Sequence, residues 1–119
     1  MGWEPGQTIK SLVVQTGPRD LCFVLVPGDR DLSTKKLARA LGVKTVDLAP
    51  VRDAERLTGY KEGGISPFGS YAALPVVLEE TLLERERVLI NAGRRGVLVA
   101  LDPWDLQAVL DAQVEDVIA

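Results

Sequence analysis

The first residue that could carry chemistry is a lysine, Lys10, within a stretch of mostly apolar side chains. Alternate side chains of a strand share one face, so we expect Lys10 to lie on the same face as Leu12 and Val14. An ammonium group on an apolar face is costly unless it reaches a rim, a cleft or an anion. Two interpretations follow: an ammonium near a strand end that simply reaches water, or a cation directed at a ligand.

A glycine-rich segment, residues 59–69, is the second candidate, with four glycines and one proline in eleven residues. The pattern predicts a long loop within residues 58–72, and loops of this length are disproportionately functional. The pair Gly63 and Gly64 lets backbone N–H groups approach a ligand closely, as an oxyanion or carboxylate site requires. The alternative is a wide connection between two elements with no binding role.

The third candidate is a tight turn at residues 93–96, which holds Arg94 and Arg95 between two glycines. Paired arginines at such a tip suit a phosphate group, because the guanidinium fork matches its geometry. The alternative is a solvated hairpin tip.

Smaller candidates indicate structural roles. Cys22 lies in an apolar strand, where a thiol is expected to be inert core. Trp104, beside a helix cap, is expected to pack. Lys35, Lys36 and Arg39 indicate a solvated helix face, with contact to an RNA backbone as the less favoured interpretation.

Composition excludes several kinds of chemistry. The 119 residues include no histidine and one cysteine, which excludes Ser-His-Asp and Cys-His nucleophile pairs and His/Cys zinc sites. Catalysis must then use lysine, carboxylates, backbone amides or groups of the substrate, and we expect no metal or other cofactor. A net charge of −3 argues against a non-specific nucleic-acid binder. Residues 1–62 hold ten Lys/Arg against eight Asp/Glu, a net charge of +2, and residues 63–119 hold four against nine, a net charge of −5. This uneven distribution is compatible with a local basic patch on an acidic protein.

Targeting signals are absent from the sequence pattern. No apolar run approaches the roughly 20 residues of a membrane helix, and the N-terminus lacks the basic start and apolar stretch of a signal peptide. A single cysteine forms no internal disulfide. We therefore expect a cytoplasmic protein.

Periodicity and capping signals predict the elements that position these residues. Strands are expected at 8–16, 21–26, 44–48, 74–78, 88–91 and 97–101, with a hairpin turn at 17–20 and an edge strand at 114–118. Helices are expected at 33–41, at 51–57 and after residue 102, with a turn or short helix at 79–84. Asp31 or Ser33 can cap the first helix. Leu106, Val109 and Leu110 of the last helix are expected to face the core.

This order of elements contains few βαβ repeats, which disfavours Rossmann and TIM-barrel layouts. It predicts an α/β fold of the α+β type: a mixed, curved, barrel-like sheet flanked by helices. We expect residues 1–119 to form one domain.

Taken in order, the motifs resemble the YbaK family of aminoacyl-tRNA deacylases, which includes free-standing proteins and the editing domain of bacterial prolyl-tRNA synthetases. The matching segments span roughly residues 7–118 and are Lys10–Val14, Gly28–Asp29, Leu37–Gly42, Leu57–Tyr60, Gly63–Gly69, Gly93–Gly96 and Trp104–Leu106. The most specific segment runs from Thr58 to Pro67. Two departures stand beside the match: relatives carry a further segment before the lysine strand, whereas Lys10 stands almost at the start of the sequence given, and several relatives have an acid where Leu98 stands.

The resemblance implies roles for individual residues. Lys10 matches the lysine on which activity in the family chiefly depends, and Ser11 stands where serine or threonine lines the pocket. The aminoacyl end of the substrate is then held by Gly63, Gly64, Ile65, Ser66 and Pro67, which we expect to line one pocket with Lys10. The implied substrate is tRNA(Pro) carrying a wrong small amino acid, cysteine or alanine.

Residues and resemblance together predict hydrolysis of the ester between an amino acid and the terminal ribose of tRNA. Backbone N–H groups of residues 63–67 would stabilise the developing oxyanion, and Lys10 would add positive charge or hold the terminal phosphate. Water activated by the substrate's own hydroxyl or amine would attack. Arg94 and Arg95 would contact acceptor-end phosphates, and prolyl-tRNA synthetase would be a further partner. The alternative is a non-catalytic module that binds aminoacyl-tRNA or a small ligand, or regulates a synthetase.

Overall fold

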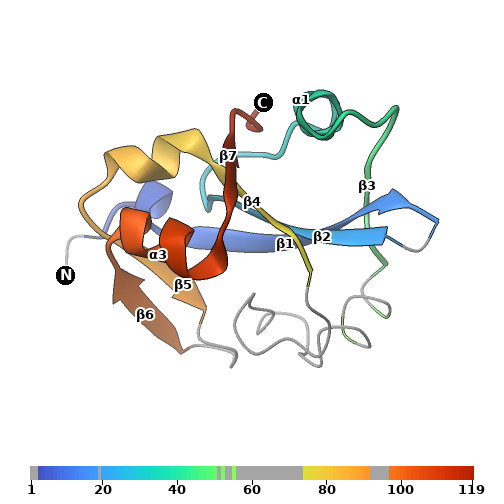
Figure 1. The fold of residues 1–119 in the computed structure, drawn as a ribbon. Coiled ribbons are helices and arrows are strands. Elements are labelled where there is room, and N and C mark those ends of the chain that lie inside the picture. Colours follow the sequence, from blue (N-terminus) through green and yellow to red (C-terminus); the bar gives the residue numbers. More distant parts are fainter. Residues whose placement is uncertain (1–2, 19, 51, 53–54, 56–73, 92–96) are drawn as a thin grey trace.

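The computed structural model describes residues 3–18, 20–50, 52, 55, 74–91 and 97–119 (Figure 1). Its described strands are β1 (Ile9–Gly17), β2 (Asp20–Pro27), β3 (Asp47–Leu48), β4 (Val76–Glu79), β5 (Val88–Asn91), β6 (Leu98–Leu101) and β7 (Gln113–Glu115). The described helices are α1 (Thr34–Leu41) and α3 (Pro103–Leu110), with 3₁₀ turns η1 (Pro5–Gln7) and η2 (Glu80–Glu84). The expected α/β class is confirmed.

The main sheet is mixed, with strand order β3-β1-β2-β4-β7. β1 pairs antiparallel with β2 and β3, whereas β4 runs parallel to both β2 and β7. A second, antiparallel pair is formed by β5 and β6. An isolated parallel bridge between Thr8 and Leu89 links the two sheets just before β1.

Alternation along β2 and β4 sends apolar side chains to both faces of the sheet, as in a strand buried on both sides. The first core cluster lies on the side of η2, α3 and β5 and contains Ile9, Val13, Phe23, Leu25, Val76, Leu78, Leu82, Val88, Ile90, Leu106 and Ala112. The second core cluster lies on the side of α1 and of residues 116–119, the C-terminal segment. It contains Val14, Cys22, Val24, Val26, Leu37, Ala38, Val46, Val77, Val117 and Ile118.

Helix α1 follows its sequence signals closely. Ser33 is the N-cap, and its hydroxyl accepts a hydrogen bond from Lys36 N at 3.2 Å. Gly42 ends the helix at φ +71°, in the left-handed region that glycine adopts without strain. Leu37 and Ala38 are buried against the second core cluster. Of the two expected caps, Ser33 is therefore correct and Asp31 is wrong.

Several expected elements differ in length. The strand expected at 44–48 is only the two exposed residues of β3, because pairing with β1 is limited to Val14–Leu48 and Gln15–Asp47. The expected edge strand is confirmed as β7 but begins at Gln113 and ends at Glu115. Of the helix expected at 51–57, the structure describes residues 52 and 55, both helical.

Two side chains of α3 contradict the expected packing. Val109 is 73% exposed and Trp104 is 60% exposed, although both were expected to pack. The covered stripe of α3 runs through Pro103, Leu106 and Leu110 at spacings of three and four residues. Val109 lies to one side of this stripe and Trp104 to the other, so the sheet covers neither.

Glu79, at the end of β4, is a fully buried carboxylate. Its Oε2 accepts hydrogen bonds from the backbone N–H of Thr81 at 2.8 Å and from the Thr81 hydroxyl, and its Oε1 accepts one from Val117 N at 2.9 Å. Buried charges persist only when such partners are present. Glu79 therefore ties the end of β4 both to η2 and to the C-terminal segment.

Candidate functional site

Lys10 lies near the start of β1, on the same face of the sheet as Leu12 and Val14, as its spacing predicts. Leu12 and Val14 belong to or pack on the second core cluster, and Lys10 pairs with Val26 across the hairpin. The side chain is 37% exposed and extends to the turn after β2, where Nζ donates a hydrogen bond to the carbonyl oxygen of Arg30 at 2.9 Å.

The ammonium group of Lys10 remains available for a ligand. Its nearest carboxylate is that of Asp31, with 3.9 Å between Nζ and Oδ1, and the Asp31 side chain is 96% exposed. A pair of this kind is screened by water and contributes little stability. An ammonium has three donors, and within the described residues only the bond to Arg30 uses one of them. Lys10 thus presents an oriented, partly exposed cation at the end of the sheet.

Ser11 points to the other face of β1, because neighbouring residues of a strand alternate. Its flanking residues Ile9 and Val13 belong to the first core cluster. The Ser11 hydroxyl oxygen is buried and has no hydrogen-bond partner among the described residues. A buried hydroxyl without a partner costs free energy of desolvation. A hydrogen bond with any polar group that reaches this hydroxyl is therefore favourable. The structure therefore does not bring Ser11 and Lys10 to the same face.

An open polar pocket of about 240 Å³ lies at the end of β2, beside the turn that Lys10 contacts. Its lining residues are Gly6, Pro27, Asp29, Arg30, Thr81, Glu84 and Arg85. Both arginines are held in place: Arg30 Nη2 donates to the carbonyl oxygen of Ala119 at 3.0 Å, and Arg85 Nη1 lies 2.6 Å from Glu4 Oε2. Sequence patterns did not reveal this pocket, because its residues come from three separate segments and form no motif.

The other predicted site residues lie outside the described part of the chain. They are Gly63, Gly64, Ile65, Ser66, Pro67, Arg94 and Arg95. Their roles, and the shared pocket with Lys10, stay predictions. Leu98, which stands where several relatives have an acid, is 47% exposed at the start of β6.

Cys22 is buried in the second core cluster, and burial raises the pKa of its thiol to about 11. A protonated, buried thiol is a poor nucleophile, which confirms the expected inert core role. Among the described residues, no group of three or more Asp, Glu and Cys side chains is arranged to hold a metal ion. None of the described helices is long and apolar enough to cross a membrane.

Comparison with known proteins gives consistent matches. The model of the aminoacyl-tRNA editing domain family matches residues 1–109. EbsC of Enterococcus faecalis, a candidate Cys-tRNA(Pro)/Cys-tRNA(Cys) deacylase, is 33% identical over 98% of this chain and 71% of its own length. The proline–tRNA ligase of Desulforamulus reducens is 38% identical over 87% of this chain, which spans only 18% of the ligase.

A solved structure described as a candidate trans-editing enzyme for prolyl tRNA synthetase superposes with a TM-score of 0.90 at 34% identity. The superposition covers 98% of this chain and 73% of that one. The fold is therefore that of the editing proteins, and the class of enzyme is aminoacyl-tRNA hydrolase. The chain belongs to the aminoacyl-tRNA editing domain family.

Proposed function

We propose that this protein is a trans-editing deacylase that hydrolyses the ester of a mischarged tRNA, with cysteine or alanine on tRNA(Pro) as substrate. The observation that carries the proposal is the Lys10 ammonium group, which the bond to Arg30 orients while two of its donors stay available. The relatives with matching sequence are named for Cys-tRNA(Pro) deacylation and for prolyl-tRNA ligation, which supports this choice of substrate. Such a reaction belongs in the cytoplasm, where aminoacyl-tRNA is made and used.

The reaction requires stabilisation of negative charge on the ester carbonyl oxygen. Lys10 supplies a fixed positive charge, either to that oxygen or to the terminal phosphate. Backbone N–H groups of residues 63–67 supply the remaining donors. Ser11, which lies on the opposite face of β1 from Lys10, takes no part at this oxygen. The vicinal ribose hydroxyl or the amino group of the substrate activates the attacking water, so no histidine is needed.

The two arginines at 94 and 95 contact acceptor-end phosphates in this proposal. Prolyl-tRNA synthetase is a further partner, because the product of editing is a tRNA that this synthetase recharges. Contact with tRNA or with the synthetase requires no covalent link between the editing protein and the synthetase.

The test is a deacylation panel of Ala-, Cys-, Ser- and Pro-tRNA pairs with wild type, Lys10→Ala and Lys10→Arg. Lys10→Ala should lower kcat/KM by at least about tenfold, equal to ~1.4 kcal/mol of transition-state stabilisation. Lys10→Arg should rescue only part of the rate, because guanidinium differs from ammonium in shape and hydration. Arg87→Ala, which removes one exposed cation elsewhere, is the charge-matched control.

Thermal unfolding separates loss of chemistry from loss of fold. Lys10→Ala should keep the melting temperature of wild type within a few degrees, since the ion pair of Lys10 with Asp31 is exposed. Wild-type rates in Lys10→Ala would refute the role of the lysine. Tight binding of aminoacyl-tRNA without turnover by the wild type would instead favour the non-catalytic binding module.

A further inference from the structure

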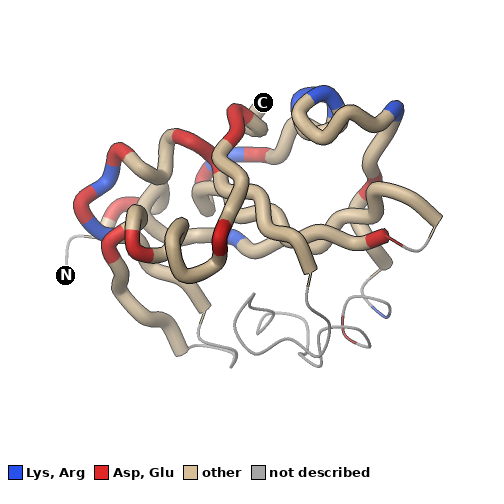
Figure 2. The backbone as a smooth tube through the Cα atoms, viewed as in Figure 1, with Lys and Arg blue, Asp and Glu red and all other residues tan. Residues whose placement is uncertain are grey.

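Charge is segregated along the molecule. Residues 33–50, which include α1, hold four Lys/Arg against one Asp, a net charge of +3. The described residues 79–91 and 97–119 hold two Lys/Arg against nine Asp/Glu, a net charge of −7. Figure 2 shows the basic residues gathered on and after α1 and the acidic residues around η2, α3 and β7. Within the described part of this acidic protein, residues 33–50 thus form a basic surface.

The charges of α1 serve the stability of the helix only in part: Arg39 lies in the last turn, where the helix dipole favours a cation, and Lys36 pairs with Asp116, but Lys35 has neither advantage. Lys35 and Lys36 occupy the first turn, where the helix dipole favours acids, and this turn holds no acid. Lys35 and Arg39 are four residues apart on one face, and like charges at this spacing repel each other. The presence of Lys35 beside Arg39 therefore calls for an explanation other than the stability of the helix.

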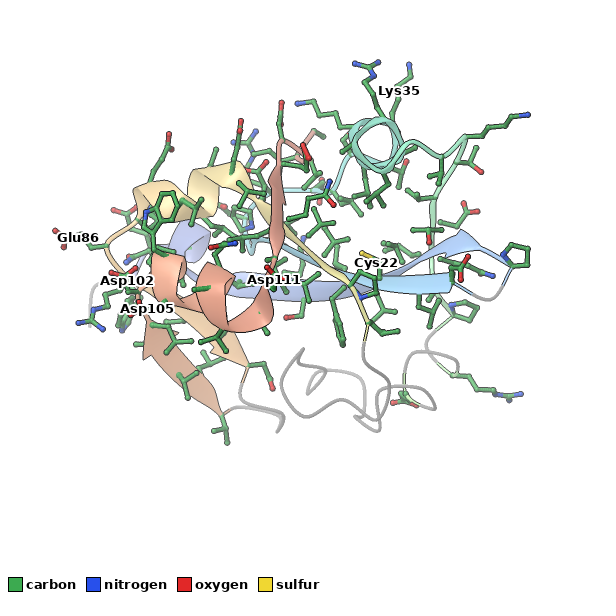
Figure 3. All side chains as sticks on the ribbon, in the orientation of Figure 1. Cys22, Lys35, Glu86, Asp102, Asp105 and Asp111 are labelled. Carbon is green, nitrogen blue, oxygen red and sulfur yellow. The ribbon has the colours of Figure 1, made fainter. Side chains whose placement is uncertain are left out.

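Lys35 and Arg39 are also unpaired. Both are exposed, and neither has an ion-pair partner among the described residues. Lys36, in contrast, forms an ion pair with Asp116 of the C-terminal segment, with 3.1 Å between Nζ and Oδ1. Figure 3 shows Lys35 on the outer side of α1, remote from the labelled acids Glu86, Asp102, Asp105 and Asp111.

The basic surface follows in the chain directly after the turn that Lys10 contacts. The turn that accepts the Lys10 hydrogen bond leads directly into α1, which begins three residues after Asp31. The N-terminus of α1 is anchored by Ser33 N, which donates to the carbonyl oxygen of Val117 at 2.7 Å, and by the Lys36–Asp116 pair. A short, anchored segment therefore joins the turn that Lys10 contacts to the helix that carries Lys35 and Arg39.

We propose that the exposed face of α1 that carries Lys35 and Arg39 binds the sugar-phosphate backbone of tRNA while the aminoacyl end lies at Lys10. This inference rests on the proposed function for its RNA partner. Charge complementarity supports it: a backbone of phosphates replaces the missing counter-charges of α1 and relieves the repulsion between its two cations.

The test compares Lys35→Ala and Arg39→Ala with Arg87→Ala, since each removes one exposed positive charge. Affinity for uncharged tRNA(Pro) is measured by fluorescence anisotropy over a series of salt concentrations. Each α1 variant should raise Kd at least about threefold at low salt and lower the slope of log Kd against log salt by roughly one unit. Arg87→Ala should leave both quantities unchanged.

Lys35→Glu gives a sharper result, because its expected effects on thermal stability and on tRNA affinity have opposite signs. The substitution places an acid in the first turn of α1 and a favourable pair with Arg39, so the melting temperature should rise slightly. The affinity for tRNA should fall further than in Lys35→Ala. A structural role for Lys35 would instead lower the melting temperature and leave Kd unchanged.

Turnover assays separate this inference from the proposed function. The α1 variants should hydrolyse an aminoacyl-adenosine, which lacks the backbone, at the wild-type rate, and mischarged tRNA more slowly at sub-saturating concentration. Wild-type affinity and salt slope in both alanine variants, with normal deacylation, would overturn the inference and leave the function intact. Weakened tRNA binding in a protein that deacylates nothing would uphold the inference and overturn the function.

Discussion

Replacing Glu79 by glutamine isolates the contribution of the buried carboxylate. The amide has the same shape, but one of its two ends is an NH₂ group that cannot accept a hydrogen bond. Oε2 accepts two bonds from Thr81 and Oε1 accepts one from Val117 N, so the least costly orientation turns the new NH₂ toward Val117. That orientation brings two donors together and leaves the buried N–H of Val117 without an acceptor.

The expected cost follows from these three bonds. An unsatisfied buried N–H costs about 1–3 kcal/mol, and the two remaining bonds each lose the extra strength of a charged acceptor. Relief from burying a charge offsets part of this loss. We expect Glu79→Gln to lower the free energy of unfolding by about 2–3 kcal/mol, which corresponds to a melting temperature lower by roughly 6–12 °C.

Urea unfolding followed by circular dichroism measures this change, with Glu80→Gln as the matched control. Glu80 is the next residue and is exposed, so its neutralisation should change the free energy of unfolding by less than about 0.5 kcal/mol. A Glu79→Gln midpoint equal to that of Glu80→Gln would refute the reasoning, because the carboxylate would then not be the acceptor that joins η2 to the C-terminal segment.

Two further predictions follow from other features. Burial raises the pKa of the Cys22 thiol from 9.0 to about 11, so the unfolded chain loses this proton first as pH rises. The stability of wild type relative to Cys22→Ala should therefore fall by about 2–3 kcal/mol between pH 9 and 11 and stay constant below pH 8, as urea titrations at each pH would reveal. For the proposed phosphate contacts, replacing Arg94 and Arg95 with alanine should weaken tRNA binding and reduce its salt dependence by about one unit for each contact, with little change in thermal stability. Equal affinity and equal salt slope in the double variant would show that the two arginines do not contact RNA.

The parts of the fold that the sequence predicts best are those with local signals. Helix α1 begins and ends where Ser33 and Gly42 predict, because an N-cap and a left-handed C-terminal glycine act within one turn. The strand β5 matches its expected bounds, 88–91. Lys10 lies on the expected face of β1, because side-chain alternation depends only on neighbouring residues.

Features that depend on contacts between distant residues could not be predicted in this way. The partner of the Lys10 ammonium is the Arg30 carbonyl group, which the turn after β2 places beside it. Glu79 was expected only to begin a turn, whereas its buried position depends on Val117, 38 residues later. Trp104 was expected to pack beside the helix cap, yet which sides of α3 are covered depends on the placement of the whole helix.

The long-range position of the C-terminal segment has a consequence for how the protein folds during translation. The hairpin of β1 and β2 is local and can form early, while the parallel pairs of β2 with β4 and of β4 with β7 join residues far apart in the chain. Val117 fills the second core cluster, and Ala119 N donates to the carbonyl oxygen of Asp31 at 2.9 Å. Since a chain emerges from the ribosome N-terminus first, the apolar side of α1 stays partly uncovered until residues 117–119 have been made. During that interval the nascent chain presents Leu37 and its neighbours to chaperones and to other unfinished chains.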